Sequence, residues 1–580
     1  MAAARDESLR ARIEVARGDR DADLLLANAR VVNVFTGEIA SANVAIAGTR
    51  VAGVSPALRR GREVIDLGGA CVVPGLVDAH LHVESSHLVP AEFARAVVPL
   101  GTTAVVTDPH EIANVLGLEG VRYMIEASRG LPLDVFVMVP SSVPATDMET
   151  AGAALGPAEI RTALGFERTI GLAEVMNFPG VVGADARVLE KIAEAPGRPV
   201  DGHAPRLRGP GLQAYAAAGI ESDHECTTLE EAREKLRCGL WLFIREGSAA
   251  RNLEALLPAV TDATHPRVAF ACDDRSAADI LAEGHVDHVV RTAIRKGLDP
   301  VRAITLATLN PARRFGLPFR GAVAPGYSAD LVVTRDLADL RASLVLKDGR
   351  VAARDGELVL GPIAGAAGGA GVPAESVRVT PLSGDAFRIA ARGPRARAIE
   401  IVPDQIVTRS AVVAVRAVDG AVAADPANDV AKIAVVERHR ASGRVGRGLV
   451  KGFGIRNGAL ASTFAHDSHN LVVLGDSDDD MLAAARRVIE MQGGFAVVSG
   501  GRVSSELALP IAGILSPRPF EEVARAEKGL VEACRALGVV PRVPFLTLAF
   551  LALPVIPELK ITDFGLVDVV NFRLVDLFDV

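Results

Sequence analysis

Short apolar runs rich in valine alternate with helix-prone stretches of ten or more residues over residues 71–320. This alternation predicts repeated strand–helix units, in which helices cover a parallel sheet. Eight runs are predicted as strands, near residues 71–80, 102–108, 134–140, 168–175, 199–203, 219–224, 240–245 and 267–273. Because eight such units in about 250 residues have the size of a TIM barrel, we predict an α/β fold with a (β/α)8 barrel at its centre.

The segments that flank the barrel have a different pattern. Residues 1–70 begin with a charged, helix-prone segment and continue with short β-rich runs between Gly, Asn and Thr turns. Residues 321–360 return to short strands, which predicts a small discontinuous β-domain built from both flanks. Residues 361–373 are rich in Gly and Ala and are predicted to be a linker. Residues 374–580 mix strands and helices, so we expect a separate C-terminal α/β domain.

Length and charge narrow the class of protein. A chain of 580 residues exceeds what one hydrophobic core supports, so several domains are expected. Its 63 Lys and Arg against 71 Asp and Glu give a net charge of −8, which argues against a nucleic-acid partner. A small-molecule substrate is the better expectation.

Cysteine usage and apolar run lengths bear on the compartment. The five cysteines are scattered without a C-x-x-C pair, and no secretory N-terminus is visible, so a reduced cytoplasmic setting is expected. Apolar stretches such as residues 546–556 are broken by proline and too short to cross a bilayer, so no membrane segment is predicted.

The strongest local signal is VVPGLVDAHLHVESS at residues 72–86. Alternate residues of a strand project to one face, so His80 and His82 can both point into the barrel mouth and hold one metal ion. An H-x-H pair alone is a weak signal. Its position at the carboxyl end of a predicted strand strengthens it, because the active sites of such barrels lie at that end.

Later strands end in further metal-type ligands. Glu174, His203, His224 and Asp273 each follow or end a predicted strand, so they should converge on the same mouth. Any one of them could be a hydrogen-bonded loop residue, but five strand ends that all offer such ligands are improbable by chance. The set predicts a catalytic site with water on a metal ion.

Two other strand ends carry polar residues. TDPHEIANVLG places Asp108, His110 and Glu111 after the second strand, and it lacks the second histidine of a zincin helix, which excludes that metalloprotease class. In IREGS, Arg245 and Ser248 follow the seventh strand and could position a catalytic base. The alternative for Arg245 is a structural ion pair with the adjacent glutamate.

Six segments together resemble the signature segments of adenine deaminases, in the amidohydrolase superfamily: VPGLVDAHLHVESS, VVTDPHEIANVLG, IREGSAARNL, FACDDR, FAHDSHNLVVLG and LALPVIPELKITD. They extend from residue 73 to 563. The resemblance implies hydrolysis of adenine to hypoxanthine and ammonia, with two divalent metal ions per chain, Mn²⁺ or Fe²⁺ before Zn²⁺. It also implies a free purine base and water as reactants, and a homo-oligomer.

The resemblance distributes the ligands over two metals: His80 and His82 for the first, His203 and His224 for the second, Asp273 for the first metal and the attacking water, and Glu174 as the bridge. Many relatives use a carboxylated lysine as the bridge. The first lysine of this chain is Lys191, in a helical stretch beyond the fourth strand, which leaves Glu174 as the candidate.

The implied chemistry assigns further roles. A metal-bound hydroxide would attack C6 of the purine, with Asp273 as the base that accepts the water proton. Glu84, Glu111 and Glu225 are candidates for the acid, and spacing does not choose among them. Candidate substrate-binding residues are Asp108, His110, Arg245, Ser248, His466, Asp467 and His469. The last three, in FAHDSHN, lie outside the barrel and could instead form a separate polar network.

Two other functions use the same fold. A cyclic amide hydrolase, like dihydroorotases and hydantoinases, would keep the metals but usually needs the bridging lysine. A non-enzymatic barrel scaffold would not need the complete ligand set. A further motif, GDSDDD at residues 475–480, resembles an acidic cation loop but is more simply the start of a helix.

Overall fold

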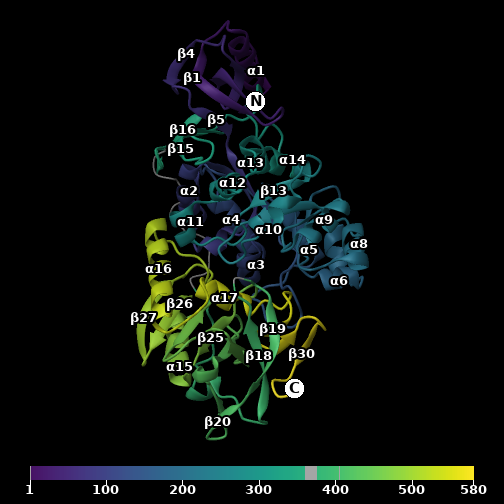
Figure 1. Cartoon of the computed structure of the whole chain (residues 1–580), viewed down its shortest axis with the longest axis vertical. Helices are drawn as coiled ribbons and strands as arrows, with labels where there is room; N and C mark the ends of the chain where they lie inside the picture. The colour runs from purple at the N-terminus through teal and green to yellow at the C-terminus, as the bar shows by residue number, and fades with distance from the viewer. Residues whose placement is uncertain (1, 360–374, 404, 580) are drawn as a thin grey trace.

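The computed structural model describes residues 2–359, 375–403 and 405–579. Three parts follow one another along its longest axis, with the N-terminal β-structure at the top of Figure 1, the barrel in the middle and the C-terminal domain below. The linker expected at residues 361–373 lies outside the described residues.

A nine-stranded sheet joins the two flanks of the barrel. Its strands are β1 (Ala22–Asn33), β2 (Glu38–Ala47), β3 (Arg50–Ser55), β4 (Gly61–Asp66), β5 (Cys71–Pro74), β14 (Leu331–Thr334), β15 (Ala342–Lys347), β16 (Arg350–Arg354) and β17 (Glu357–Leu358). Helix α1 (Ala2–Arg17) packs beside β2 and β3. β14 pairs antiparallel with β5, which brings segments far apart in the chain into one sheet.

The run expected as one strand over residues 71–80 is divided at Gly75. β5 belongs to the nine-stranded sheet, whereas β6 (Leu76–Leu81) begins the barrel. A Cβ atom on Gly75 would lie 2.2 Å from the Thr103 hydroxyl oxygen, so only glycine fits here. The apolar pattern continues through Gly75 because both strands are buried, and it therefore does not reveal the change of sheet.

The barrel contains eight strands, one from each expected run, and the first begins only at Leu76. They are β6, β7 (Thr102–Thr107), β8 (Asp134–Val139), β9 (Thr169–Val175), β10 (Val200–Gly202), β11 (Ser222–Asp223), β12 (Trp241–Arg245) and β13 (Val268–Ala271). β6 to β10 form one parallel sheet and β11 to β13 another. A parallel bridge between Leu81 and Asp273 joins the first strand to the end of the last.

Helices surround the strands (Figure 1). They are α2 (Pro90–Val97), α3 (His110–Leu116), α4 (Leu118–Ala127), α5 (Pro157–Leu164), α6 (Phe178–Val182), α7 (Ala186–Ala193), α8 (Gly209–Ala217), α9 (Leu229–Arg237), α10 (Leu253–Leu256), α11 (Ala277–Glu283), α12 (Val286–Arg295), α13 (Pro300–Leu306) and α14 (Leu309–Arg314). Small and large apolar residues such as Ala79, Val106 and Phe243 form a buried cluster from several strands, so the barrel is packed. The expected α/β barrel is confirmed.

The C-terminal domain is built on an eight-stranded sheet in the order β19-β18-β23-β22-β25-β24-β26-β27. These strands are β18 (Arg395–Ile401), β19 (Thr408–Ala414), β22 (Val430–Val436), β23 (Val445–Lys451), β24 (Ala459–Ser462), β25 (Leu471–Gly475), β26 (Gly494–Ser499) and β27 (Arg502–Ala508). The remaining elements are β20 (Arg416–Val418), β21 (Ala421–Ala423), β28 (Leu559–Thr562), β29 (Gly565–Asp568), β30 (Arg573–Val575), α15 (Asp478–Glu490), α16 (Phe520–Ala536) and α17 (Pro544–Phe550).

GDSDDD is the start of a helix, as expected. Ser477 accepts a hydrogen bond from the Asp480 backbone N–H as the N-cap of α15, and three aspartates occupy the first turn.

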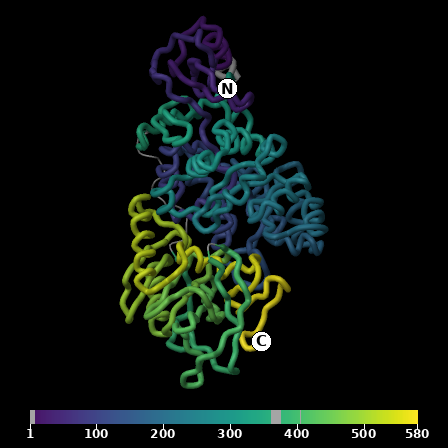
Figure 2. The backbone as a smooth tube through the Cα atoms, viewed as in Figure 1, coloured from purple at the N-terminus to yellow at the C-terminus, as the bar shows by residue number. Residues whose placement is uncertain are grey.

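The C-terminal domain lies directly against the barrel. The backbone tube in Figure 2 shows yellow and green segments beside the blue and teal barrel. Helix α16 packs on α11, the Ser516 N–H donates to the carbonyl oxygen of His87, and Asn470 donates to the carbonyl oxygen of Thr150. The β24–β25 loop, residues 463–470, is thereby held at the barrel.

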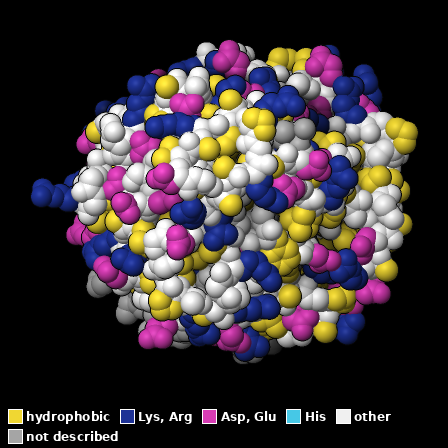
Figure 3. Space-filling model, turned by 90° about the horizontal axis from the view of Figure 1, so that it is seen from below, with side chains coloured by type: hydrophobic (Ala, Val, Ile, Leu, Met, Phe, Trp, Pro, Cys, Tyr) yellow, Lys and Arg dark blue, Asp and Glu magenta, His cyan; other side chains and the backbone are white. Residues whose placement is uncertain are grey.

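The surface is mixed in charge, and the cysteines form no disulfide among the described residues. Seen from below, cationic and anionic side chains are interspersed over the face in Figure 3. The five cysteines all lie within the described residues and are unpaired, four of them buried. None of the helices in the described part of the chain has the length and apolar character that crossing a bilayer requires.

Lys235 on α9 fixes the segments that follow β10 and β11. Its fully buried ammonium donates to the carbonyl oxygen of Ala204 at 2.7 Å and to Asp223 and Glu231 at 2.8 Å each. Asp223 in turn accepts from the Ala204 N–H at 2.9 Å. This network joins the strand ends that carry His203 and His224.

Replacing Lys235 by methionine leaves two buried carboxylates without their cation. We expect the Lys235→Met variant to lose about 3–5 kcal/mol of unfolding free energy, measured by urea unfolding followed by circular dichroism. Arg233→Met, at an exposed position of the same helix, is the matched control and should shift the transition little. Equal shifts in the two variants would contradict the structural role of the buried network.

Candidate metal centre

Six buried side chains converge at the carboxyl end of the barrel strands. His80 and His82 come from the end of β6, Glu174 from β9, and His203, His224 and Asp273 from the residues after β10, β11 and β13. Each is at most 5% exposed. Strand alternation accounts for the shared direction of His80 and His82, since they are two residues apart.

The two oxygens of Glu174 face different histidines. Oε1 lies 3.8 Å from Nε2 of His80 and 3.4 Å from Nε2 of His82. Oε2 lies 2.7 Å from Nδ1 of His203 and 3.2 Å from Nε2 of His224. Burial alone would raise the pKa of Glu174, but His224 and His203 hold it well below its usual range. The ionised carboxylate is therefore placed between two pairs of imidazoles.

Asp273 lies beside the pair formed by His80 and His82. Its Oδ1 lies 3.7 Å from Nε2 of His80 and 3.2 Å from Nε2 of His82. Its Oδ2 accepts a hydrogen bond from Nη1 of Arg245 at 2.5 Å. Against the effect of burial, Arg245 and His82 hold the pKa of Asp273 well below its usual range.

The donor set fits divalent cations. Nε2 of His80 and Nε2 of His203 are buried and have no hydrogen-bond partner among the described residues. Uncharged imidazole nitrogens and ionised carboxylates within a few ångströms of one another are the ligands that first-row divalent metals take. The six residues therefore form two candidate half-sites that share Glu174.

Arg245 pairs with two carboxylates of the cluster. Besides Asp273, it binds Glu225 through both Nη1 and Nη2, at 2.5 and 2.7 Å. The alternative pairing of Arg245 with the adjacent Glu246 is not what the structure contains, because Glu246 instead accepts from the Leu253 N–H at 3.1 Å. The guanidinium is turned inward because a buried arginine needs buried acceptors.

The three candidate acids have different surroundings. Glu225 is held by Arg245, and Glu111 lies within 2.6 Å of Nδ1 of His466 and in closer contact with Nε2 of His469. Among the described residues, no cationic side chain is bonded to Glu84. Its Oε1 accepts from the Ile112 N–H at 3.3 Å, and its Oε2 has no hydrogen-bond partner among the described residues. Burial raises the pKa of Glu84 to about 7.

The β24–β25 loop of the C-terminal domain reaches the barrel mouth. We call His110, Glu111, His466, Asp467 and His469 the Glu111 cluster. Nε2 of His110 lies 3.5 Å from Oε1 of Glu111 and 3.6 Å from Oδ1 of Asp467, and Nδ1 of the same ring lies 3.0 Å from Oδ2 of Asp108. The three loop residues, whose location the sequence left open, therefore lie beside the candidate metal centre.

Ser248 is separated from these ligands. Its hydroxyl donates to Asp279 at 2.5 Å, and it lines a cavity of about 720 Å³ between the barrel and the C-terminal domain together with Ser85, Phe464 and Phe545. Ser85, on the wall of this cavity, contacts Asp274, which follows the ligand Asp273.

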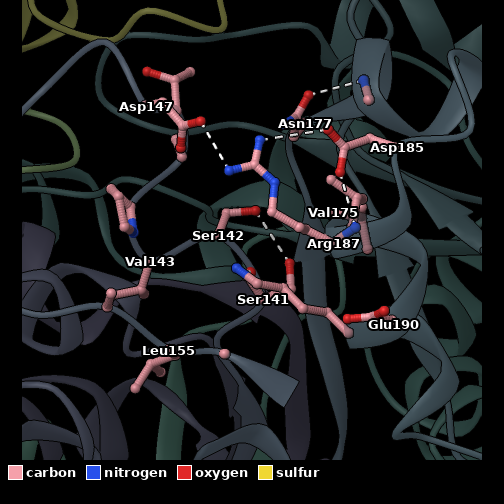
Figure 4. Close-up of a pocket in the computed structure, with 18 of the residues that line it drawn as sticks. Ser141, Ser142, Val143, Asp147, Leu155, Val175, Asn177, Asp185, Arg187 and Glu190 are labelled. Atoms are coloured by element: carbon pink, nitrogen blue, oxygen red, sulfur yellow. Dashed lines mark hydrogen bonds and ion pairs between the residues drawn. The ribbon is translucent and has the colours of Figure 1, made fainter.

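A second cavity, of about 860 Å³, opens beside β8 and β9 (Figure 4). None of the six candidate ligands is among the described residues that line it. Ser141, on its wall, donates a hydrogen bond to the carbonyl oxygen of Glu174 at 2.7 Å. Sequence reasoning missed this serine, since nothing in its local pattern separates it from an ordinary loop residue.

The comparisons with known proteins place the chain in a family. Residues 71–365 match the model of the Amidohydrolase family, and residues 405–573 match the Adenine deaminase C-terminal domain. The adenine deaminases of Desulfatibacillum aliphaticivorans and Methanothrix thermoacetophila are 48% and 47% identical to it, over 98% of this chain and 99% of each relative. A solved β-aspartyl dipeptidase from Fervidobacterium islandicum aligns with a TM-score of 0.45 at 16% identity, over 59% of this chain and 99% of its own.

The barrel and its match thus define a member of the amidohydrolase family, a family of hydrolases. Within it, the chain belongs to the adenine deaminase family, since both relatives extend over almost its whole length.

Changing the shared carboxylate should remove metal without unfolding the protein. We expect Glu174→Gln, loaded with Mn²⁺ and dialysed, to retain at least tenfold less metal at the two half-sites, because an amide supplies neither the charge nor two anionic oxygens. Metal per chain is measured by plasma mass spectrometry, with circular dichroism as the test of folding.

Glu149→Gln is the matched control, a buried carboxyl that accepts from Thr146 away from the six ligands. Full metal content in Glu174→Gln would show that Glu174 is not a ligand.

Proposed function

We propose that this chain hydrolyses adenine to hypoxanthine and ammonia at a binuclear centre, as part of purine salvage or breakdown. The observation that carries the proposal is the position of Glu174, whose two oxygens face two separate histidine pairs. Its relatives of nearly equal length are named adenine deaminase.

Two divalent cations would be held by His80, His82 and Asp273 on one side and His203 and His224 on the other, with Glu174 between them. Mn²⁺ or Fe²⁺, with Zn²⁺ as a further option, suits this set of nitrogen and carboxylate donors. When bound, such cations polarise water and make it a nucleophile near neutral pH.

Asp273 is the proposed base. Arg245 holds its Oδ2, so Oδ1, which faces His80 and His82, is the atom that accepts the proton of the attacking water. The water oxygen adds to C6 of adenine as the double bond from C6 to N1 opens and N1 takes a proton from the acid. The exocyclic nitrogen then takes the proton that Asp273 had accepted and leaves C6 as ammonia, and hypoxanthine remains. Arg245 and Glu225 act as positioning residues. Glu225 holds the guanidinium of Arg245 in place through two hydrogen bonds, and Arg245 in turn holds Asp273.

Glu84 is the proposed acid among the three candidates. Glu225 and Glu111 are bound by cationic or imidazole partners, whereas Glu84 keeps one buried oxygen without a partner among the described residues. A carboxyl with a pKa of about 7 is still protonated in part at neutral pH and can deliver a proton to a purine nitrogen or to the leaving amine.

The two alternatives have less support. The bridging lysine usual in cyclic amide hydrolases is not supplied by Lys191, which donates to the carbonyl oxygen of Ser141 at 2.9 Å. A non-enzymatic scaffold gives no reason for six buried ligands to converge. The homo-oligomer is a proposal from the resemblance to relatives, and the cytoplasmic setting is a proposal from the scattered cysteines.

The substrate assignment is tested with protein loaded with Mn²⁺ and assayed for ammonia release from adenine, guanine, cytosine, adenosine and dihydroorotate. We expect adenine to be the preferred substrate. If adenine is inert and dihydroorotate reacts, the proposal is wrong and the cyclic amide hydrolase is the better description.

The acid assignment predicts a pH-dependent loss. We expect Glu84→Gln to lower kcat by about 10²–10⁴-fold while metal content is unchanged. Because the protonated form donates and the pKa lies at about 7, kcat of the unmodified protein should fall as pH rises through 7, and the variant should lack this limb. Glu246→Gln, a buried carboxyl outside the cluster, is the control. A retained alkaline limb in Glu84→Gln would assign the proton to another group.

A further inference from the structure

The Glu111 cluster joins two domains through five buried side chains. His110 and Glu111 begin α3 of the barrel, and the other three belong to the β24–β25 loop of the C-terminal domain. Each is at most 3% exposed. One ring nitrogen each of His110 and His466 and one carboxylate oxygen each of Glu111 and Asp467 all lie within 4.8 Å of one another.

The close contacts in this cluster do not have the geometry of hydrogen bonds. Both oxygens of Glu111 lie close to imidazole nitrogens, yet neither has a hydrogen-bond partner among the described residues. Nε2 of His469 and Oδ2 of Asp467 likewise have no partner in the described part of the chain. Buried polar atoms in native proteins are normally satisfied, so such a concentration of unsatisfied atoms needs a cause.

Another pair in the same interface shows the contrast. His87 of the barrel and Glu527 of α16 are also buried, and Nδ1 of His87 forms a hydrogen bond of 2.6 Å with Oε1 of Glu527, although Nε2 of the same ring has no partner among the described residues. A histidine and a glutamate from the two domains can therefore be joined by a well-formed hydrogen bond in this protein. The Glu111 cluster instead resembles the candidate metal centre, where Nε2 of His80 and of His203 lacks a partner among the described residues.

We propose that the Glu111 cluster binds a third divalent cation, of the Mn²⁺, Fe²⁺ or Zn²⁺ class, in addition to the two at Glu174. The donors are one imidazole nitrogen each of His110 and His466 and carboxylate oxygens of Glu111 and Asp467. Nδ1 of His469 accepts a hydrogen bond from the Ala465 N–H at 3.1 Å, so Nε2 of His469 carries the proton and faces Glu111 beside the site. A mixed set of this kind suits first-row transition metals better than Mg²⁺ or Ca²⁺, which take oxygen ligands.

A cation at this position would join the C-terminal domain to the barrel. His110 connects it to the catalytic side, because Nδ1 of the ring lies 3.6 Å from Oε1 of Glu174 while Nε2 faces Glu111. Occupancy of the third site would thus fix the orientation of His110 and the position of the β24–β25 loop over the mouth. This role is independent of which substrate the protein hydrolyses.

The test is a count of tightly bound metal by plasma mass spectrometry after loading with Mn²⁺ and dialysis against metal-free buffer. We expect three equivalents per chain in the unmodified protein, two in Asp467→Asn, and one in Glu174→Gln, in which only the third site remains. His87→Gln is the matched control, a buried histidine of the same interface outside the cluster, and should keep three equivalents.

A second readout is the thermal unfolding temperature with and without a chelator, which requires no enzymatic activity. In the Glu174→Gln background, a chelator should lower the thermal unfolding temperature of the protein, and the added Asp467→Asn change should abolish that effect. Two equivalents in the unmodified protein together with none in Glu174→Gln would overturn the third site and leave the proposed binuclear centre intact. Fewer than two in the unmodified protein would count against both.

Discussion

Glu174 lies at the middle of the barrel mouth, and its two oxygens are turned toward different pairs of histidines. The other features of the site depend on keeping this carboxylate ionised while it is fully buried. An isolated buried carboxylate would take up a proton, so it must be compensated by positive charge nearby. The proposed cations supply that compensation, and the imidazoles complete their set of ligands. Ser141, which follows β8, donates a hydrogen bond to the carbonyl oxygen of Glu174 and so holds the backbone of that residue.

Other buried charges near Glu174 are also paired, in two networks of hydrogen-bonded ion pairs. Arg245 joins Asp273 to Glu225, and Lys235 joins the segments after β10 and β11. Removal of one partner from such a pair costs more than the pair contributes, because it leaves a buried charge alone. The catalytic geometry and the stability of the barrel therefore rest on the same side chains. The C-terminal domain adds the Glu111 cluster to this arrangement, so the mouth is completed by both domains.

Much of the barrel could be predicted from the sequence, because apolar periodicity and strand-end position are local signals. The eight strands lie where the pattern placed them, and the six candidate ligands meet at one end because parallel strands share a direction. The division at Gly75 was not predicted, since it depends on contact with a threonine in the next strand.

What the sequence could not decide depends on contacts between segments far apart in the chain. The location of the loop with His466 and the inward pairing of Arg245 follow from partners many residues away, and the proposal of Glu84 as the acid rests on an oxygen without a partner among the described residues. Spacing within a motif carries no information on such partners. The FACDDR segment places the carboxylate of Asp274 directly after Asp273, but it does not indicate that Asp274 contacts Ser85.

The proposed function requires Glu174 to lie between two cations. The most direct test is anomalous X-ray diffraction at the manganese edge from crystals of the Mn²⁺-loaded protein. We expect two peaks at the barrel mouth, one coordinated by each oxygen of Glu174, with His80 and His82 on one and His203 and His224 on the other. A single peak there, with Glu174 outside its coordination shell, would contradict this proposal.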